Sequence, residues 1–306
     1  MSYAVLFSGQ GTQHPAMLPW LESAPAGQAA LQAMGDAIGS DWRAGLEDAQ
    51  RRSRNAFAQP LLVGTALAAW AALAAERDAP PAALAGYSVG ELPAYACAGV
   101  FSPQTAITLA LQRAALMDAA VAGLDTGLLS VSGLPVAQVL CAQPDLDCAI
   151  AIGADQAIYA GMDSALGKAA QVLTAQGALC KRLDVRVASH SRWMASAAQG
   201  FARQLEALPF ARPHATLVLN ATGSSTRDPQ VLRNALSAQI AHTVQWAACM
   251  DALAEQGVAC VIEVGAGTTL SKMWNQRHPD TPARSLEEFR DVAGAARWIR
   301  RHAAQA

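Results

Sequence analysis

Gly86-Tyr87-Ser88-Val89-Gly90 lies between a short apolar run, residues 82–85, and a stretch beginning at Glu91 that is typical of a helix start. A G-x-S-x-G motif between a strand and a helix is the nucleophile elbow, whose glycines allow a tight turn and a close approach of strand and helix. Ser88 would lie exposed at the carboxyl end of the strand, where amide N–H groups at the helix start stabilise a developing oxyanion. The motif predicts a catalytic serine. An ordinary glycine turn is the alternative, because G-x-S-x-G also occurs by chance.

The chain on either side of this motif alternates between short β-rich runs and long helical patterns. Such alternation is typical of a mostly parallel sheet with helices on both faces, so the sequence predicts an α/β fold. The expected strands cover 3–7, 82–87, 216–220 and 259–264, and the expected helices include 58–77, 89–98, 103–121, 191–207, 229–241, 246–256 and 268–275. The first of these helices is rich in alanine and apolar on most faces, which predicts that it is buried.

The middle of the chain follows a different order. The pattern predicts strand, helix, strand, strand, helix and strand over 128–132, 135–142, 148–153, 157–162, 164–176 and 179–185. This βαββαβ order is the split βαβ of a ferredoxin-like unit. We therefore expect an α/β core made of residues 1–124 and 188–306, with an inserted ferredoxin-like subdomain over 125–187.

The composition is that of a folded protein. Of the 306 residues, 52% are hydrophobic and 15% are charged, and the net charge is −2. A disordered chain would be less apolar and more highly charged, and a duplex nucleic acid or an anionic membrane would require a basic surface. No apolar run approaches the roughly 20 residues that span a bilayer, and the N-terminus lacks the basic region of a signal peptide. We expect no nucleic-acid partner and no membrane association.

Six cysteines are scattered through apolar contexts with no C-x-x-C pair. Buried, reduced thiols of a cytoplasmic protein are the simplest interpretation, and a cysteine nucleophile is the alternative. No group of His, Cys and acidic residues has the spacing of metal ligands, so we expect no metal. The expected location is the cytoplasm.

A serine nucleophile needs a base, which is usually a histidine. Of the six histidines, His190 lies in Val187-Ala188-Ser189-His190-Ser191, where a strand is expected to end and a helix to begin. Loops at such junctions often carry catalytic groups in α/β folds. Position alone makes His190 either the general base or a residue that forms local hydrogen bonds.

The loop after the first expected strand is Gly9-Gln10-Gly11-Thr12-Gln13. Its glycines could bring a backbone N–H close to a substrate and complete an oxyanion hole. The Gly-Lys-Ser/Thr of a phosphate-binding Walker A loop does not follow, and the third glycine of the dinucleotide fingerprint is missing.

Arg113 lies on an otherwise apolar stripe of its expected helix, with Leu109, Leu116 and Met117 as neighbours. Such an arginine either reaches back to water or points inward to a fixed anion. A planar guanidinium is well suited to bind a carboxylate through two hydrogen bonds. The pattern leaves both interpretations open.

Together these segments resemble the malonyl-CoA:acyl carrier protein transacylase family, whose catalytic domain also occurs in fatty acid and polyketide synthases. They occur in the family's order and at close to its spacing, over roughly residues 3–275. The matching segments are Phe7-Ser8-Gly9-Gln10-Gly11-Thr12-Gln13, Gly86-Tyr87-Ser88-Val89-Gly90-Glu91, Gln112-Arg113-Ala114-Ala115-Leu116-Met117, Ser189-His190-Ser191-Arg192-Trp193-Met194, Val244-Gln245-Trp246 and Glu263-Val264-Gly265-Ala266-Gly267. Each segment alone is weak evidence, but the six together are highly specific.

The resemblance implies a hydrolase-like α/β core with an inserted ferredoxin-like subdomain. It implies that Ser88 is the nucleophile and His190 the general base. A backbone carbonyl, expected from Gln245, would orient the imidazole in place of an aspartate. The backbone N–H groups of Gln10 and Val89 would form the oxyanion hole.

The resemblance also implies that Arg113 pairs with the free carboxylate of malonyl. The expected partners are malonyl-CoA and an acyl carrier protein, which supplies the prosthetic thiol, so the enzyme itself needs no cofactor. The expected reaction is a ping-pong transfer through malonyl-Ser88, by a chain that is monomeric on its own.

Four departures from the family pattern refine the expectation. Tyr87 replaces the usual His at the elbow, Ser8 replaces a common Pro before Gly-Gln-Gly, and Ala266 replaces a common Pro in Gly-Pro-Gly. The usual Asn-containing stretch before the second strand pair is altered to Gly153-Ala154-Asp155-Gln156. The Gly-Tyr-Ser-Val-Gly elbow is similar to that of the transacylase (epsilon) subunit of malonate decarboxylase. This similarity implies loading of a carrier protein with a CoA-like prosthetic arm, with other malonate decarboxylase subunits as partners. Loading in fatty acid or polyketide synthesis is the alternative.

Two other classes of function remain alternatives. A serine esterase or thioesterase uses the same elbow with water as the acceptor, and Asp184 lies six residues before His190, as a triad could require. The His-Gly-Gly-Gly oxyanion loop of such enzymes is missing. A non-catalytic scaffold in a carrier-protein complex would have no need for Ser88, His190 and Arg113 together.

Overall fold

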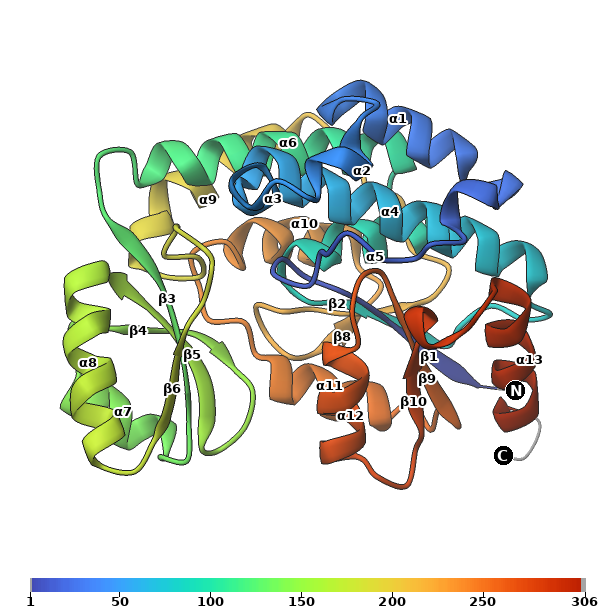
Figure 1. Cartoon of the computed structure of the whole chain (residues 1–306). Helices are drawn as coiled ribbons and strands as arrows, with labels where there is room; N and C mark the ends of the chain where they lie inside the picture. Colours follow the sequence, from blue (N-terminus) through green and yellow to red (C-terminus); the bar gives the residue numbers. More distant parts are fainter. Residues whose placement is uncertain (1, 304–306) are drawn as a thin grey trace.

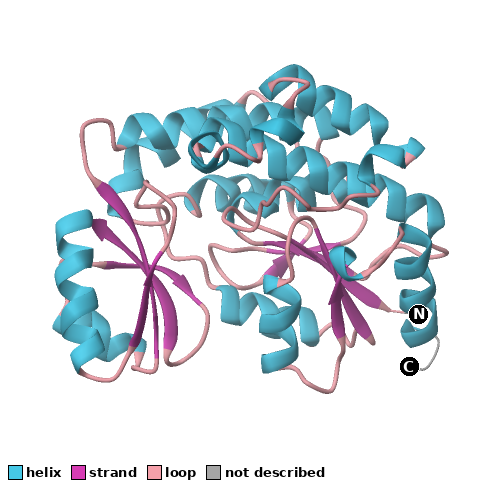
Figure 2. Cartoon of the chain, viewed as in Figure 1, coloured by secondary structure: helices cyan, strands magenta, loops and turns pink. Residues whose placement is uncertain are grey.

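The computed structural model describes residues 2–303, which form a larger α/β part and a smaller part with its own sheet (Figures 1 and 2). The strands are β1 (Tyr3–Phe7), β2 (Ala83–Gly86), β3 (Thr126–Ser132), β4 (Asp147–Ala151), β5 (Gln156–Met162), β6 (Leu179–Arg182), β7 (Thr216–Val218), β8 (Ser225–Thr226), β9 (Cys260–Val264) and β10 (Ala283–Ser285). The α-helices are α1 (Gln28–Ile38), α2 (Trp42–Gly45), α3 (Ala49–Ser53), α4 (Asn55–Glu76), α5 (Glu91–Cys97), α6 (Pro103–Ala120), α7 (Val136–Ala142), α8 (Asp163–Ala175), α9 (Ala195–Glu206), α10 (Pro229–Ala238), α11 (Trp246–Ala254), α12 (Thr269–Arg277) and α13 (Val292–Ala303).

The larger sheet has the strand order β10-β9-β1-β2-β7-β8. All its neighbouring pairs are parallel except β7 with β8. The expected α/β fold with a mostly parallel sheet is therefore confirmed. Parallel strands align their carboxyl ends along one edge, so the loops after β1, β2 and β9 meet at that edge.

The central strand β1 separates two apolar layers. Tyr3, Val5 and Phe7 pack into the core on one face of the sheet, and Ala4 and Leu6 into the core on the other. Successive side chains of a strand point to opposite faces, which produces this division. Helices α4, α5 and α13 pack on the first face, with α1 and α6 against α4, and α11 and α12 cover the second face (Figure 1).

Helix α4 is the longest of the described helices and is buried along most of its length, as expected. It begins at Asn55 rather than Ala58, and it packs between α1 and α6. By length and composition it is apolar enough to cross a membrane, which corrects the expectation that no apolar run approaches that length. Within the fold 89% of its apolar window is buried, as in the core helix of a globular protein.

The smaller sheet has the antiparallel order β4-β5-β3-β6. Helices α7 and α8 cover one face of it (Figure 1), where Leu129, Val131 and Tyr159 pack against Leu166 and Leu173. The order of its elements along the chain is βαββαβ, so the ferredoxin-like prediction is confirmed. The last strand ends at Arg182, three residues earlier than expected, and one further backbone hydrogen bond joins Leu183 to Leu128 of β3.

Backbone hydrogen bonds join the small sheet to the larger part. The Ala151 N–H donates to the carbonyl of Val244, and the Val244 N–H donates to the carbonyl of Ala149, both at 2.9 Å. The segment before α11 therefore runs parallel to β4 over one bridge. The domain boundaries expected at 124/125 and 187/188 stay a prediction.

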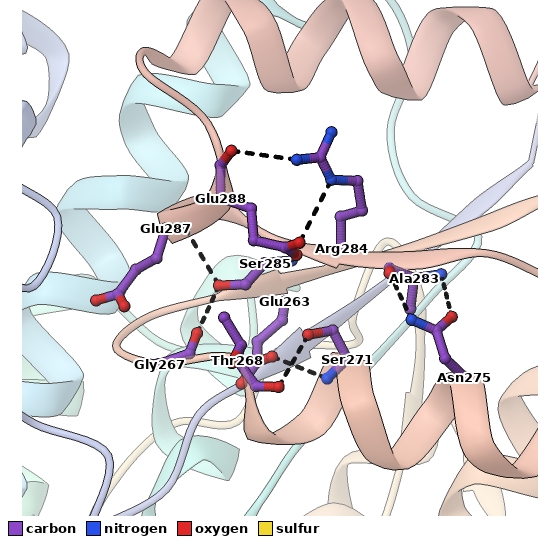
Figure 3. A network of polar contacts seen from close by, with 10 residues as sticks. All are labelled: Glu263, Gly267, Thr268, Ser271, Asn275, Ala283, Arg284, Ser285, Glu287 and Glu288. Carbon is purple, nitrogen blue, oxygen red and sulfur yellow. Dashed lines mark hydrogen bonds and ion pairs between the residues drawn. The ribbon is translucent and has the colours of Figure 1, made fainter.

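A polar network fixes the loop between β9 and α12 (Figure 3). The buried carboxylate of Glu263 accepts hydrogen bonds from the backbone N–H groups of Leu270 (3.1 Å) and Ser271 (2.8 Å) and from the hydroxyl of Ser8 (3.4 Å). The hydroxyl of Ser285 donates to the carbonyl of Gly267 at 2.6 Å. Burial raises the pKa of Glu263 to about 7. The network ties the β9–α12 loop to Ser8, which directly precedes the Gly9–Gly11 loop.

Candidate active site

Ser88 lies at the tip of the turn between β2 and α5. Its φ is +57°, a left-handed conformation that is uncommon for a residue with a side chain and is found at strained functional turns. A Cβ at Gly86 would overlap the carbonyl of Gly90, and a Cβ at Gly90 would overlap the carbonyl of Phe7. Both glycines of the motif are therefore needed for this turn to pack against the sheet.

Ser88 and His190 form a hydrogen-bonded pair although 102 residues separate them. The Oγ of Ser88 lies 2.7 Å from Nε2 of His190. The other ring nitrogen, Nδ1, lies 2.5 Å from the carbonyl oxygen of Gln239, which can only accept a hydrogen bond. Nδ1 therefore carries the proton, and Nε2 is left free to accept the serine proton.

The carbonyl that orients His190 belongs to Gln239, so the prediction of Gln245 was wrong. The carbonyl of Gln245 accepts instead from the N–H of Cys249 in the first turn of α11, and its own N–H donates to the carbonyl of Asn220. The chain turns back after α10, so that the carbonyl of Ile240 also accepts from the His190 N–H at 3.0 Å. Both carbonyls on His190 thus come from the two residues that follow α10, several residues before the segment that resembles the family.

His190 is buried, and its backbone also has a positive φ, +59°. Burial lowers the pKa of His190 to about 3, with a further contribution from the nearby charge of Arg113, opposed by the Gln239 carbonyl. Removing a cation from water and placing it beside another cation both favour the neutral ring. The imidazole is therefore neutral at physiological pH, as a general base must be.

Asn220 holds the elbow in place and was not identified from the sequence. Its Nδ2 donates to the carbonyl of Gly86 at 2.7 Å, and its Oδ1 accepts from the N–H of Ser88 at 2.8 Å. One fully buried amide therefore bridges the residues on either side of Tyr87. Asn220 follows β7, the strand next to β2. No local motif marks it, and only its position just after a strand could have suggested a role.

Glu91 is a second residue at the elbow without an assigned role. Its Oε1 accepts from the backbone N–H of Asn220 at 2.7 Å, and no partner for its Oε2 exists among residues 2–303. Burial raises the pKa of Glu91 to about 8, although the Asn220 N–H and the charge of Arg113 both act in the opposite direction. The Glu91 carboxyl thus fixes the backbone of the residue that fixes Ser88.

The two expected oxyanion donors lie on loops that meet beside Ser88. Neither the Gln10 N–H nor the Val89 N–H has an acceptor in the part of the chain that the structure describes. A Cβ at Gly9 would overlap the carbonyl of Tyr87, so the glycine allows the two loops to touch. The side-chain amide of Gln10 donates to Oδ1 of Asn55 at 2.9 Å, which ties its loop to α4. These contacts are consistent with an oxyanion hole, which stays a prediction.

Arg113 projects from α6 into the same centre and is 1% exposed. Its Nη1 donates to Oε1 of Gln59 at 2.8 Å, and its Nη2 lies 3.3 Å from the Ser88 hydroxyl. Its Nε has no partner among the described residues, and no ion pair within residues 2–303 involves it. Burial lowers its pKa to about 10, so it remains charged. A buried cation without a carboxylate partner is costly, and such a group suits the binding of an anion.

Tyr87, the departure at the elbow, packs edge-on against Trp246, with ring centroids 4.9 Å apart. Burial raises the pKa of its phenol well above the usual value.

Within residues 2–303 no group of three or more His, Cys, Asp and Glu side chains could hold a metal ion. The side chains of Ser88, His190 and Arg113 meet in the hydrogen-bonded centre.

Comparisons with known proteins agree with this geometry. A family model described as acyl transferase domain matches residues 5–305. The malonyl CoA-acyl carrier protein transacylase of Mycobacterium tuberculosis is 34% identical over 299 residues, covering 94% of this chain and 97% of that protein. The crystal structure of MCAT from Mycobacterium tuberculosis matches with a TM-score of 0.87 and 32% identity, covering 97% of this chain and 100% of that one.

A second solved structure includes a partner. The malonyl-transacylase PlMCAT, in complex with the type II PKS acyl-carrier protein AntF, matches with a TM-score of 0.89 and 26% identity over the full length of both chains. The similarity therefore covers the small sheet as well as the larger part.

Proposed function

The chain belongs to the acyl transferase domain family, and from that membership we propose that it is a malonyl-CoA:acyl carrier protein S-malonyltransferase. The observation that carries the proposal is Arg113, a buried guanidinium without an acidic partner, 3.3 Å from the Ser88 hydroxyl. Malonyl thioesters carry a free carboxylate close to the reacting carbonyl. The cation would hold that carboxylate while the carbonyl faces Ser88.

In the first half-reaction Nε2 of His190 removes the proton from Ser88 as Oγ attacks the thioester carbonyl. The Oγ–C bond forms, and the negative charge on the former carbonyl oxygen is stabilised by the N–H groups of Gln10 and Val89. The C–S bond then breaks, and the protonated His190 gives its proton to the leaving thiolate of CoA. The product is a malonyl-Ser88 ester with its carboxylate on Arg113.

In the second half-reaction the thiol of the carrier protein transfers its proton to Nε2 of His190 and attacks the ester carbonyl. The C–Oγ bond breaks, and the proton returns to Ser88. The buried carbonyl of Gln239 keeps the imidazole in one tautomer during both steps. Arg113 provides selectivity, because an acetyl group would leave its charge unpaired.

The acceptor is an acyl carrier protein, and two settings are compatible with the relatives, fatty acid and polyketide synthesis. The Gly-Tyr-Ser-Val-Gly elbow supports a third, more specific setting, the transacylase subunit of malonate decarboxylase. In that setting the acceptor is a carrier protein with a CoA-like prosthetic arm, and the chain works beside the other subunits. The three settings are separated by measuring kcat/KM with each type of carrier protein. We propose that the carrier with the CoA-like arm is preferred.

Intact-mass spectrometry after brief incubation with malonyl-CoA or acetyl-CoA tests the activity. We expect one malonyl adduct on the wild-type chain, none with acetyl-CoA, and none on Ser88→Ala. Absence of both an adduct and CoA release would favour the scaffold. CoA release without an adduct and without a thiol acceptor would favour a thioesterase, although His190 Nδ1 is paired with a carbonyl rather than with Asp184.

A cytoplasmic location and a monomeric chain belong to the same proposal. All six cysteines are free thiols, three of them buried. Reduced cysteines are typical of proteins that work in reducing compartments. Size-exclusion chromatography with light scattering checks the monomer, which has a mass of 31.8 kDa.

A further inference from the structure

A cavity of 460 Å³ opens between the helices of the larger part and the loop that follows β6. Its wall is formed by the end of α3 and the start of α4, the end of α6, and the loop after β6. Figure 1 shows these segments where the smaller part meets the helices of the larger part. None of the catalytic residues described above lines it.

The cavity shares its supporting elements with the catalytic centre. Asn55 in the cavity wall is one turn of α4 before Gln59, which holds Arg113. Its side chain also accepts from Gln10 and donates to Asp118 at 2.5 Å. Val187, which also lines the cavity, is three residues before His190. A ligand in this cavity would therefore lie beside the loops that carry the base and the oxyanion donors.

Two exposed arginines, Arg54 just before α4 and Arg186 in the loop after β6, line the cavity. No ion pair or side-chain hydrogen bond to another residue engages either guanidinium within residues 2–303. The two arginines that precede Arg54 in the chain already have partners within the protein. Arg51 pairs with Asp41, and Arg52 donates to the carbonyl of Leu46. The wall holds one acid, Asp118, whose Oδ1 accepts from Asn55 and whose pKa is raised by partial burial.

The other residues that line the cavity include both polar and apolar side chains. Gln50 and Ser53 lie on the side of Arg54, and Val121, Leu124 and Val187 supply apolar surface. Such a cavity fits a flexible arm with aliphatic and amide segments and a phosphate at its far end. Guanidinium groups pair with phosphate through parallel hydrogen bonds, which makes two free arginines well suited to that end.

We propose that this cavity binds the phosphate-bearing part of the thioester arm, with Arg54 and Arg186 as its two cations. The inference rests on the proposed malonyl transfer and adds a subsite to it. The same chemistry could be presented by CoA or by the prosthetic arm of a carrier protein. Since the reaction has a donor and an acceptor half, both arms can occupy the subsite in turn.

The test compares thioesters that differ only in phosphate. Arg54→Gln, Arg186→Gln and the double variant are measured with malonyl-CoA and with malonyl-N-acetylcysteamine, which has the thioester but no phosphate. Arg212→Gln, at an exposed arginine outside the cavity wall, is the matched control. We expect kcat/KM for malonyl-CoA to fall about fivefold in each single variant, mainly through KM, since exposed ion pairs are worth up to about 1 kcal/mol.

The phosphate-free thioester separates binding from folding or chemistry. Its kcat/KM should be unchanged in all three variants, and the salt dependence of KM for malonyl-CoA should be weaker in the double variant. An equal loss with both thioesters, or no loss with malonyl-CoA, would overturn the subsite. The acceptor half identifies the source. A loss with CoA alone as acceptor assigns the subsite to CoA, and an equal loss with the holo carrier protein assigns it to both arms.

Direct binding distinguishes failure of the subsite from failure of the proposed function. Calorimetry with CoA and with pantetheine on wild-type protein requires no turnover. We expect CoA to bind more tightly than pantetheine, and the difference to shrink in the double variant but not in Arg212→Gln. Equal affinity for CoA and pantetheine overturns the subsite, whether or not malonyl transfer is found. Tighter CoA binding without malonyl transfer would count against the proposed function alone.

Discussion

Nη2 of Arg113 lies 3.3 Å from Oγ of Ser88, so the cation of the centre touches the nucleophile itself. A positive charge at this distance stabilises the developing alkoxide and repels a proton on His190. When a substrate carboxylate pairs with Arg113, part of that field is neutralised and His190 becomes a better proton acceptor. Arg113, which we propose selects the substrate, therefore also changes the proton affinity of His190.

We expect Arg113→Met to lower the rate of malonyl transfer by roughly a hundredfold or more, since a buried charged hydrogen bond is worth up to about 3 kcal/mol. The ratio of acetyl to malonyl transfer should rise, because no unpaired charge would then penalise acetyl. Acylation rates with malonyl-CoA and acetyl-CoA check this. Unchanged malonyl selectivity in a folded variant would contradict the assignment.

The same substitution should raise the pKa of His190. In the wild-type protein this pKa is lowered to about 3 by burial and by Arg113, so the ring should stay neutral from neutral pH down to strongly acidic pH. Removing the cation removes one of the two causes. Histidine NMR shifts followed against pH provide the measurement, with Ser88→Ala as a variant that keeps Arg113. An ordinary pKa near 6.5 in the wild-type chain would show that the site is open to water.

Asn220→Ala should separate elbow geometry from substrate binding. The substitution removes the side-chain hydrogen bonds to Gly86 and Ser88 and leaves two buried groups unpaired, so we expect a loss of about 1–3 kcal/mol in unfolding free energy. Transfer should be slower through kcat, while the Arg113 subsite and hence KM change little. Asn220→Asp keeps the acceptor for the Ser88 N–H and loses the donor to Gly86. Full activity in both variants would show that the turn holds its shape without Asn220.

Glu91→Gln should change how stability depends on pH. The pKa of Glu91 is about 8 in the fold and near 4.5 in an unfolded chain, so the folded state binds more protons between these values. Unfolding free energy therefore falls as pH rises from about 4.5 to 8 because of this group, and the variant should lack that contribution. Denaturant unfolding at several pH values tests the difference, with Glu255→Gln on the surface as control. Parallel pH profiles for the variant and the wild type would contradict it.

Much of the fold could be predicted from local pattern. The elbow can be recognised because the turn itself requires its glycines. The apolar residues of β1 and of α4 predict that both elements are buried, as the structure shows. The βαββαβ order was readable because its strands and helices alternate over short distances. The sequence pattern predicts no helix at the positions of α1 and α13.

The site was less accessible to sequence reasoning, because its supports come from distant parts of the chain. Ser88, His190 and Arg113 lie in recognisable segments. The structure brings His190 and Arg113 within hydrogen-bonding distance of the Ser88 hydroxyl. Gln239 contributes a backbone carbonyl, which any residue type could supply, so the sequence carries no signal for it. The prediction of Gln245 rests on its place in a segment that resembles the family.

Residues 239–245 have a role that none of the individual contacts reveals. Within seven residues this strap orients the base through Gln239, pairs with the edge of β4 through Val244, and holds Asn220 through Gln245. The inserted sheet is thereby anchored to a segment that contacts His190 directly and reaches Ser88 through Asn220. A small subdomain transplanted from a relative must bring a β4 edge in the same register. A graft that misses this register would detach the strap and misalign both partners of the pair, even with every catalytic residue intact.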